Sequence, residues 1–196
     1  MKHSLRIIGG TWKGHRLKVP SLRGLRPTSD FIRETLFNWL GQRITGANVV
    51  DLFAGTGSLG FEALSRGAAH ATFVERNWRA TRMLRTACHQ FNLSASEASV
   101  VSANCISWLK SKNARWDIVF VDPPFERTEL YGKVLQELLA HLSSDSIVYL
   151  EFSKRCSVER LDYSTWKSSV AGEVQFELLL PPKVSACPAK LASKNS

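Results

Sequence analysis

A stretch at residues 49–64 limits the possible folds of this chain more than any other feature. Apolar residues 49–54 lead into a loop with the spacing G-x-G-x-x-G (Gly55, Gly57, Gly60), and a helix-like pattern follows. Glycine tolerates positive φ and lets a ligand approach the backbone, and the first turn of a helix offers unpaired N–H groups. The order strand, glycine loop, helix predicts one unit of a parallel α/β sheet with a polar ligand at the loop.

Strands and helices alternate along most of the chain. We predict strands near 48–53, 70–75, 98–102, 117–122 and 146–152, and helices near 29–41, 59–66, 77–91, 105–112 and 129–142. A closing strand is expected at 174–180. This alternation is typical of a doubly wound, Rossmann-like sheet, in which ligands bind beyond the carboxyl ends of the strands.

Polar residues follow four of these strands: Asp51, Glu75, Asn104 and Asp122. A carboxylate at the position of Glu75 would accept hydrogen bonds from the two hydroxyls of a ribose. A nicotinamide dinucleotide site has the same loop and the same acid, so these features alone leave that alternative open. Asn104 is explained equally well as a turn residue at a strand end.

Asp122-Pro123-Pro124-Phe125 closes the apolar run at 118–121. Pro124 pushes Pro123 into an extended conformation, and neither proline has an N–H, so we expect carbonyls that point outward beside the Asp122 carboxylate. Such a pair can accept hydrogen bonds from an amino group, while Phe125 offers a face for stacking of a nucleobase. The chemistry indicated is modification of an exocyclic amine, although a turn that caps the next helix explains a bare D-P-P-F as well.

Basic residues predominate in the chain and exclude few partners. Lys and Arg number 26 against 17 acids, giving a formal net charge of +9 over 196 residues. This favours RNA, DNA or an anionic surface as partner. The apolar runs are short, so we expect no membrane span and a cytoplasmic protein. The Cys and His residues lack the spacing of metal ligands, so we expect no metal site and reduced thiols.

Positive charge is concentrated in residues 1–28, where no acid occurs. We expect a short hairpin or arm that binds a polyanion, followed by a domain at 29–180 and a disordered tail at 181–196. The arginines at 76, 79, 82 and 85 drift around their helix, so a solvated face is favoured there over an RNA-binding stripe.

Several motifs occur in a fixed order: Arg6-Ile7-Ile8-Gly9-Gly10, Trp12-Lys13-Gly14, Arg26-Pro27-Thr28, Arg33-Glu34-Thr35-Leu36-Phe37-Asn38-Trp39-Leu40, residues 51–60, residues 62–68, Val121-Asp122-Pro123-Pro124-Phe125 and Val170-Ala171-Gly172. Through them the chain resembles the RsmD family of class I S-adenosylmethionine-dependent methyltransferases, over nearly all of its length to about Leu180. The family methylates guanine N2 in small-subunit (16S) rRNA, at guanine 966.

The resemblance implies a seven-stranded methyltransferase sheet, mostly parallel with the last strand antiparallel, and S-adenosylmethionine as cofactor. The implied cofactor-binding residues are Asp51, Gly55, Gly57, Gly60, Glu75 and Asn104, and the implied catalytic residues are Asp122, Pro123 and Phe125. The expected RNA-binding residues are Lys13, Arg16, Arg23, Arg26 and Arg33, although Arg26 and Arg33 could instead touch the cofactor. The expected partner is 16S rRNA or the assembling 30S subunit, bound by a monomer.

Three other functions remain open on the sequence. Another amino methyltransferase could act on adenine N6 or cytosine N4 of DNA, or on a protein glutamine, because D-P-P-F tolerates each amine. A nicotinamide-dependent enzyme would leave D-P-P-F without a role. A non-catalytic RNA-binding module would leave Glu75 and the glycine loop without one.

Overall fold

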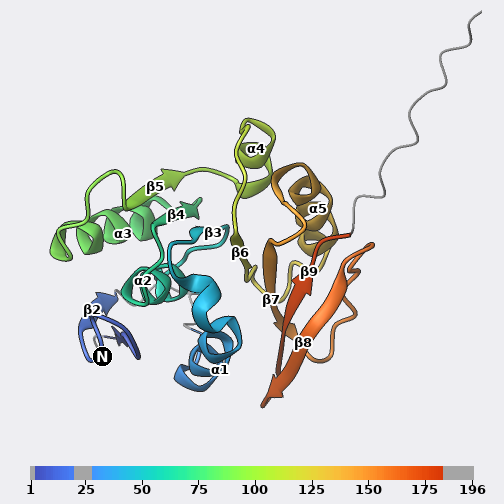
Figure 1. The fold of residues 1–196 in the computed structure, drawn as a ribbon, viewed down its shortest axis with the longest axis horizontal. Coiled ribbons are helices and arrows are strands. Elements are labelled where there is room, and N and C mark those ends of the chain that lie inside the picture. Colours follow the sequence, from blue (N-terminus) through green and yellow to red (C-terminus); the bar gives the residue numbers. More distant parts are fainter. Residues whose placement is uncertain (1–2, 20–27, 183–196) are drawn as a thin grey trace, which may run out of the picture.

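The computed structural model describes residues 3–19 and 28–182, and a seven-stranded sheet forms the centre of this part (Figure 1). Its strands lie in the order β5-β4-β3-β6-β7-β9-β8. Their bounds are β3 Asn48–Asp51, β4 His70–Glu75, β5 Ala98–Ser102, β6 Ile118–Val121, β7 Ile147–Ser153, β8 Ser164–Ala171 and β9 Val174–Leu180. The five strands β5, β4, β3, β6 and β7 are parallel to one another, and β9 is antiparallel to both β7 and β8. The predicted Rossmann-like sheet with an antiparallel last strand is confirmed.

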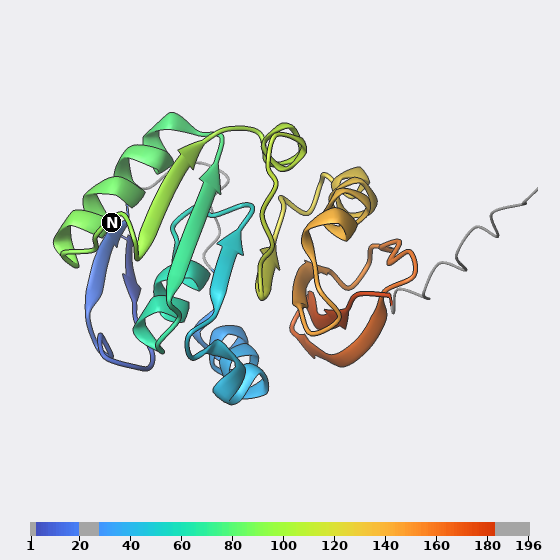
Figure 2. The same ribbon diagram turned by 45° about the horizontal axis from the view of Figure 1, so that its top comes forward.

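Helices cover both faces of the sheet. They are α1 Asp30–Leu40, α2 Ser58–Ser65, α3 Trp78–Gln90, α4 Cys105–Lys110 and α5 Glu129–Leu138. Side chains of α1, α2 and α3 belong to one buried cluster and those of α4 and α5 to a second. Figure 1 shows α4 and α5 above the sheet and α1 and α2 below it, and in Figure 2 the parallel strands β3, β4 and β5 point the same way. Their carboxyl ends therefore meet at one edge.

Strand β6 illustrates why these residues form a central strand. All four of its residues, Ile118-Val119-Phe120-Val121, are buried. Ile118 and Phe120 join the cluster below the sheet, whereas Val119 and Val121 join the one above. A strand covered on both faces needs apolar residues on both, because parallel strands are buried by helices on either side.

Local capping sets the bounds of α1. The Ser29 hydroxyl accepts a hydrogen bond from the backbone N–H of Ile32 at 3.3 Å, so the helix begins at Asp30. It ends at Gly41, whose φ of 52° is one that glycine adopts without strain. The cap places Thr28, which precedes Ser29, beside the carboxyl edge of the sheet.

A separate two-stranded sheet precedes the main one. Strands β1 His3–Arg6 and β2 Arg16–Val19 pair in antiparallel fashion and lie beside α2 (Figure 1). The Trp12 ring in the connecting loop stacks on Phe91 with 4.2 Å between ring centroids. A basic hairpin is thus present at the N-terminus and packs on the core of the sheet and its helices.

Strand β8 is absent from the predicted elements. Its burial alternates between exposed and half-buried residues, because it is the edge strand of the sheet. Its sequence Ser-Thr-Trp-Lys-Ser-Ser-Val-Ala offers few apolar residues to mark it. Residues 20–27 and 183–196, which include Arg23, Arg26 and most of the predicted tail, lie outside the described residues. No helix in the described part of the chain is long and apolar enough to cross a membrane.

Candidate active site

A cavity of about 470 Å³ lies where the parallel strands end. Residues that follow β3, β4, β5 and β6 line it, together with Thr28 before α1. Its acidic lining residues are Asp51, Glu75, Asp122, Glu126 and Glu151. Four of the predicted site residues that follow different strands, Asp51, Glu75, Asn104 and Asp122, are therefore brought together in one cavity.

Asp51 ends β3 and is almost fully buried, with 3% of its surface exposed. Burial raises the pKa of this carboxyl from its ordinary value of 3.8 to about 7, and repulsion from Glu75 acts in the same direction. Hydrogen bonds from the backbone N–H groups of Phe53 and Gly60 partly oppose the rise. A buried carboxyl in a cavity with a strongly raised pKa is suited to a cationic ligand, whose charge would favour ionisation.

Glu75, at the end of β4, is held by two backbone donors. Its Oε2 accepts the N–H of Gly55 at 2.9 Å and its Oε1 accepts the N–H of Asn77 at 2.7 Å. Each carboxylate oxygen can accept more than one hydrogen bond, so the group can still bind two hydroxyls. The bond to Gly55 also ties the glycine loop to the neighbouring strand.

Only the first of the three predicted loop glycines lines the cavity. Gly55 is a lining residue, whereas a Cβ at Gly57 would collide with Phe61 and Leu84, and a Cβ at Gly60 with the Phe73 ring. The roles of Gly57 and Gly60 in cofactor binding stay predictions. Gly57 also has a φ of 78° and begins α2, and both glycines allow α2 to pack closely on its neighbours.

Asn104 lines the cavity and also caps α4. Its side-chain oxygen accepts the N–H groups of Ile106 at 3.1 Å and Ser107 at 3.2 Å. In this structure the Asn104 side-chain oxygen therefore acts as the turn and cap residue that the alternative explanation expects. A contact between Asn104 and the adenine of a cofactor stays a prediction.

The segment after β6 places three predicted catalytic residues in the cavity wall. Asp122 and Phe125 are half-buried and Pro123 is buried. The Pro124 carbonyl accepts the N–H of Arg127 at 2.9 Å, so the expectation of outward, unpaired carbonyls is wrong for that residue. The turn closed by this bond holds Phe125 against the core below the sheet.

Glu151 on β7 is a cavity residue that the sequence analysis missed. Its side chain is almost buried, at 5% exposed, and its Oε2 accepts the Tyr149 hydroxyl at 2.8 Å. The Tyr131 hydroxyl donates to the Glu151 carbonyl at 2.8 Å. An acid inside the apolar run Ile-Val-Tyr-Leu-Glu-Phe was the available signal.

Two buried tyrosines lie near Asp122 and Glu151. Burial raises the pKa of both Tyr131 and Tyr149, and the nearby carboxylates of Asp122 and Glu151 raise it further. Both phenols therefore stay protonated at neutral pH and act as hydrogen-bond donors.

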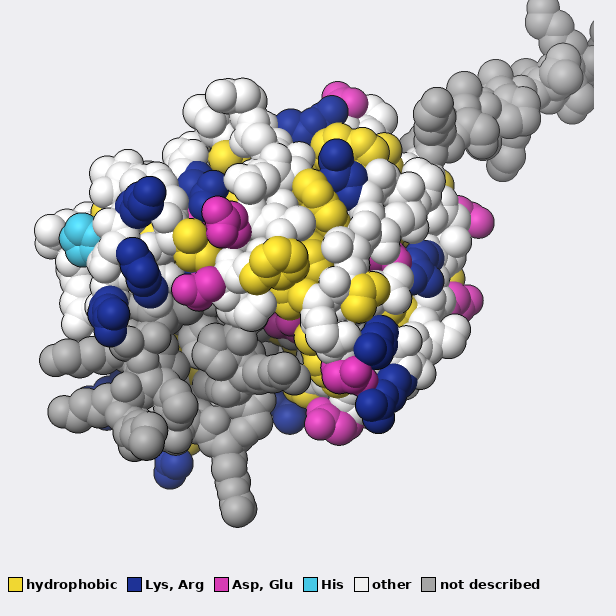
Figure 3. Space-filling model, turned by 90° about the horizontal axis from the view of Figure 1, so that it is seen from below, with side chains coloured by type: hydrophobic (Ala, Val, Ile, Leu, Met, Phe, Trp, Pro, Cys, Tyr) yellow, Lys and Arg dark blue, Asp and Glu magenta, His cyan; other side chains and the backbone are white. Residues whose placement is uncertain are grey.

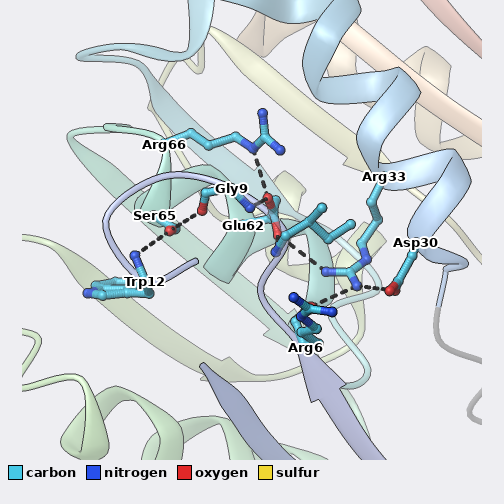
Figure 4. A network of polar contacts seen from close by, with 9 residues as sticks. Arg6, Gly9, Trp12, Asp30, Arg33, Glu62, Ser65 and Arg66 are labelled. Atoms are coloured by element: carbon cyan, nitrogen blue, oxygen red, sulfur yellow. Dashed lines mark hydrogen bonds and ion pairs between the residues drawn. The ribbon is translucent and has the colours of Figure 1, made fainter. Parts of the chain in front are cut away.

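Arg33, predicted to bind RNA, lies fully buried and is corrected here. Figure 4 shows its guanidinium between Glu62 and Asp30: Nη1 lies 3.3 Å from Glu62 Oε2, and Nη2 lies 2.6 Å from Asp30 Oδ1. Nη2 also donates to the Arg6 carbonyl at 2.8 Å. The residue connects α1, α2 and the hairpin, so it is not accessible to a polyanion.

Glu62 is the centre of this network and was not singled out from the sequence. Beyond Arg33, it accepts the N–H groups of Ile8 at 2.9 Å and Gly9 at 2.8 Å and pairs with Arg66 Nε at 2.8 Å. Four donors around a fully buried carboxylate compensate for its burial. The network fastens the N-terminal segment to the helix that follows the glycine loop.

Of the other predicted RNA-binding residues, Lys13 and Arg16 are exposed on the hairpin. Arg23 and Arg26 lie outside the described residues, as noted above. No group of three or more potential metal ligands occurs among the residues that the structure describes.

Comparisons with known proteins agree over most of the chain. The family model described as "Conserved hypothetical protein 95" matches residues 5–179. The ribosomal RNA small subunit methyltransferase D of Escherichia coli (strain K12) is 42% identical over 177 residues, which cover 89% of this chain and 88% of that protein. The protein of the same name from Haemophilus influenzae is 35% identical over 182 residues, covering 90% and 94%.

A solved structure supports the same relationship. A candidate methyltransferase from Escherichia coli is 40% identical, with a TM-score of 0.81, over 92% of this chain and 99% of that chain. The strand order, the cavity at the carboxyl edge and the extent of these matches lead to one conclusion: the chain belongs to the RsmD family of methyltransferases.

Proposed function

We propose that this chain transfers a methyl group from S-adenosylmethionine to the exocyclic N2 of one guanine in 16S rRNA, at the position of guanine 966. One observation carries the proposal: the amine-accepting segment Asp122-Pro123 and the acids Asp51 and Glu75 line a single cavity. The names of the relatives support small-subunit rRNA as the substrate. The resemblance of the sequence motifs supports guanine N2 as the atom methylated.

The residues of the cavity fit this cofactor. S-adenosylmethionine carries two positive charges near its methyl group, on the sulfonium and the ammonium, and supplies the methyl for transfer. The cavity is acidic, and Asp51 is a buried carboxyl that a cation would help to ionise. Glu75 is held by Gly55 and Asn77 at the end of β4, and it would accept the ribose hydroxyls.

Asp122 would stabilise the charge that moves during transfer. As the carbon–sulfur bond breaks and the carbon–nitrogen bond forms, positive charge appears on the amine, which then loses a proton to regain neutrality. A fixed carboxylate beside the amine favours that change without having to reorganise. The carbonyl of Pro123 would share in orienting the two N–H donors of the amine.

Phe125 would define the plane of the target base. Its half-buried ring lies in the cavity wall and packs on the core, so it offers a fixed face for stacking. A guanine inside an A-form helix cannot present N2 to such a cavity. The target nucleotide should therefore be unpaired or flipped out of its stack.

RNA binding would rest on the basic surface around the hairpin. Lys13 and Arg16 are exposed there, and the formal net charge of the chain is +9. On the face in Figure 3, Lys and Arg side chains are spread around a central band of hydrophobic side chains rather than gathered in one patch. Contacts to phosphates at several separate points fit this distribution better than one continuous groove.

Mass spectrometry of rRNA nucleosides tests the proposal. Small-subunit rRNA from cells lacking the protein should lose one N2-methylguanosine, and wild-type protein with S-adenosylmethionine should restore it. The Asp122→Ala variant, added at the same concentration as wild type, should restore N2-methylguanosine much more slowly. The appearance of methyladenosine or methylcytidine instead would assign the chain to another class of amino methyltransferase.

A further inference from the structure

We propose that Glu151 is a specificity-determining residue, which accepts the N1–H of the target guanine while Asp122 accepts a hydrogen bond from N2. The inference rests on the proposed function and deepens it, because it identifies the group that would select guanine over other bases with an exocyclic amine.

Strand pairing brings the two acids together. Strands β6 and β7 are parallel, with Val121 opposite Leu150. Asp122 directly follows the end of β6, and Glu151 is the next residue of β7. Successive residues alternate between the faces of a sheet, and Val121 and Leu150 both belong to the cluster above it. Glu151 therefore extends from the face opposite Leu150, Asp122 lies one residue beyond β6, and both line the cavity.

The surroundings of the two acids support their proximity. The charges of both carboxylates raise the pKa of Tyr131 and of Tyr149, so both lie near the same two phenols. The Tyr149 hydroxyl donates to Glu151 Oε2, and the Tyr131 hydroxyl donates to its backbone carbonyl. The bond from Tyr149 holds the side chain of Glu151 in place before a base arrives, and the bond from Tyr131 holds its backbone. A selective site requires such an arrangement.

The Watson–Crick edges of the bases explain why a second carboxylate would select guanine. Guanine presents two neighbouring donors, N1–H and the N2 amino group. Adenine and cytosine present an amino group beside a ring nitrogen with a lone pair. Two adjacent carboxylates match two adjacent donors, whereas in adenine or cytosine the second carboxylate would face a lone pair and lose a partner in a largely buried site.

The experiment compares guanine with 2-aminopurine at the target position of a synthetic rRNA fragment. 2-Aminopurine keeps the amino group at C2 but has a lone pair at N1 and no oxygen at C6, and the variant below isolates the contribution of N1. Wild-type protein should methylate guanine on the order of 100-fold faster in kcat/KM, because only guanine supplies the N1–H donor. Similar rates on the two wild-type substrates would overturn the inference without any variant.

Glu151→Gln distinguishes base selection from a structural role. The amide of glutamine can donate to the N1 lone pair of 2-aminopurine, so the preference for guanine should fall at least about 10-fold. Titration calorimetry should show unchanged affinity for S-adenosylmethionine, which also verifies that the variant folds. A lower rate on both substrates with an unchanged ratio would leave Glu151 a structural residue and refute the inference.

Glu177→Gln is the matched control. Glu177 is also a buried glutamate, 3% exposed, on the neighbouring strand β9, but it pairs with Arg160 and is not among the cavity residues. Its loss should leave the guanine preference intact. If wild-type protein instead methylates no guanine N2 in any fragment, the proposed function itself fails, and that outcome is distinct from an unchanged ratio in Glu151→Gln.

Discussion

Asp51→Asn should stabilise the cofactor-free protein at neutral and alkaline pH while weakening cofactor binding. The Asp51 carboxyl is 3% exposed, and its pKa rises from 3.8 to about 7 on folding. At 1.36 kcal/mol per pKa unit, its ionisation in the folded state costs about 4 kcal/mol. Asparagine has nearly the same shape but never ionises, so it avoids this cost.

The sign of the pH dependence follows from proton binding. Between pH 3.8 and about 7 the folded state holds more protons at Asp51 than the unfolded state, so stability falls as pH rises through that window and levels off above it. The free energy of unfolding of Asp51→Asn minus that of wild type should therefore grow by about 2 to 3 kcal/mol from pH 5 to pH 8. All other titrating groups are common to both proteins and cancel in this difference.

Urea unfolding of both proteins at pH 5, 6, 7 and 8, without cofactor, measures that difference. With saturating S-adenosylmethionine at pH 8, wild type should become the more stable of the two proteins. The ammonium of the cofactor would stabilise the ionised Asp51, and tighter binding of the cofactor to wild type would add to its free energy of unfolding. Parallel stability curves for the two proteins from pH 5 to pH 8 would refute the reasoning, since they would mean that Asp51 ionises in the folded protein as it does in water.

Four further variants test the site and the hairpin. Asp122→Ala should retain cofactor affinity and lose on the order of 100-fold in methyl transfer, with Asp122→Asn recovering only part, as single-turnover kinetics would show; parental rates would contradict its role. Glu75→Ala should weaken the binding of S-adenosylmethionine by roughly 1 to 3 kcal/mol in titration calorimetry. An unchanged affinity would mean that Glu75 does not bind the ribose. The double variant Lys13→Ala with Arg16→Ala should reduce the slope of log RNA affinity against log salt concentration by about one for each lost phosphate contact. Its affinity for the cofactor serves as the control. An unaltered slope would exclude the hairpin as an RNA-binding surface.

The parts of the site that could be predicted from sequence are those with a local cause. Asp51, Glu75 and Asp122 each follow a short apolar run, and the carboxyl ends of parallel strands meet at one edge whatever the rest of the chain does. The glycine loop likewise combines three glycines with a helix start.

The parts that could not be predicted depend on partners distant in sequence. Arg33 carries a charge, which usually indicates exposure, but Glu62 lies 29 residues away and allows it to be buried. Glu151 is one acid in an apolar strand, and only the pairing of β6 with β7 places it beside Asp122. Strand β8 was not predicted because it is mostly polar, whereas β5, the other edge strand of the sheet, contains Ala98, Val100 and Val101.

Because of the ionic network around Glu62, removal of the N-terminal segment should lower the stability of the remaining core. A truncated protein that began after β2 would remove the two N–H donors of Ile8 and Gly9 and the Arg6 carbonyl, and would leave Glu62 and Arg33 with fewer partners at the newly opened surface of α2. Gly10 strengthens the connection, because its backbone lies so close to the Ser65 carbonyl that no side chain would fit. The segment that carries Lys13 and Arg16 is therefore fastened to α2, the helix that begins at the glycine loop, so the hairpin and the loop share one rigid support.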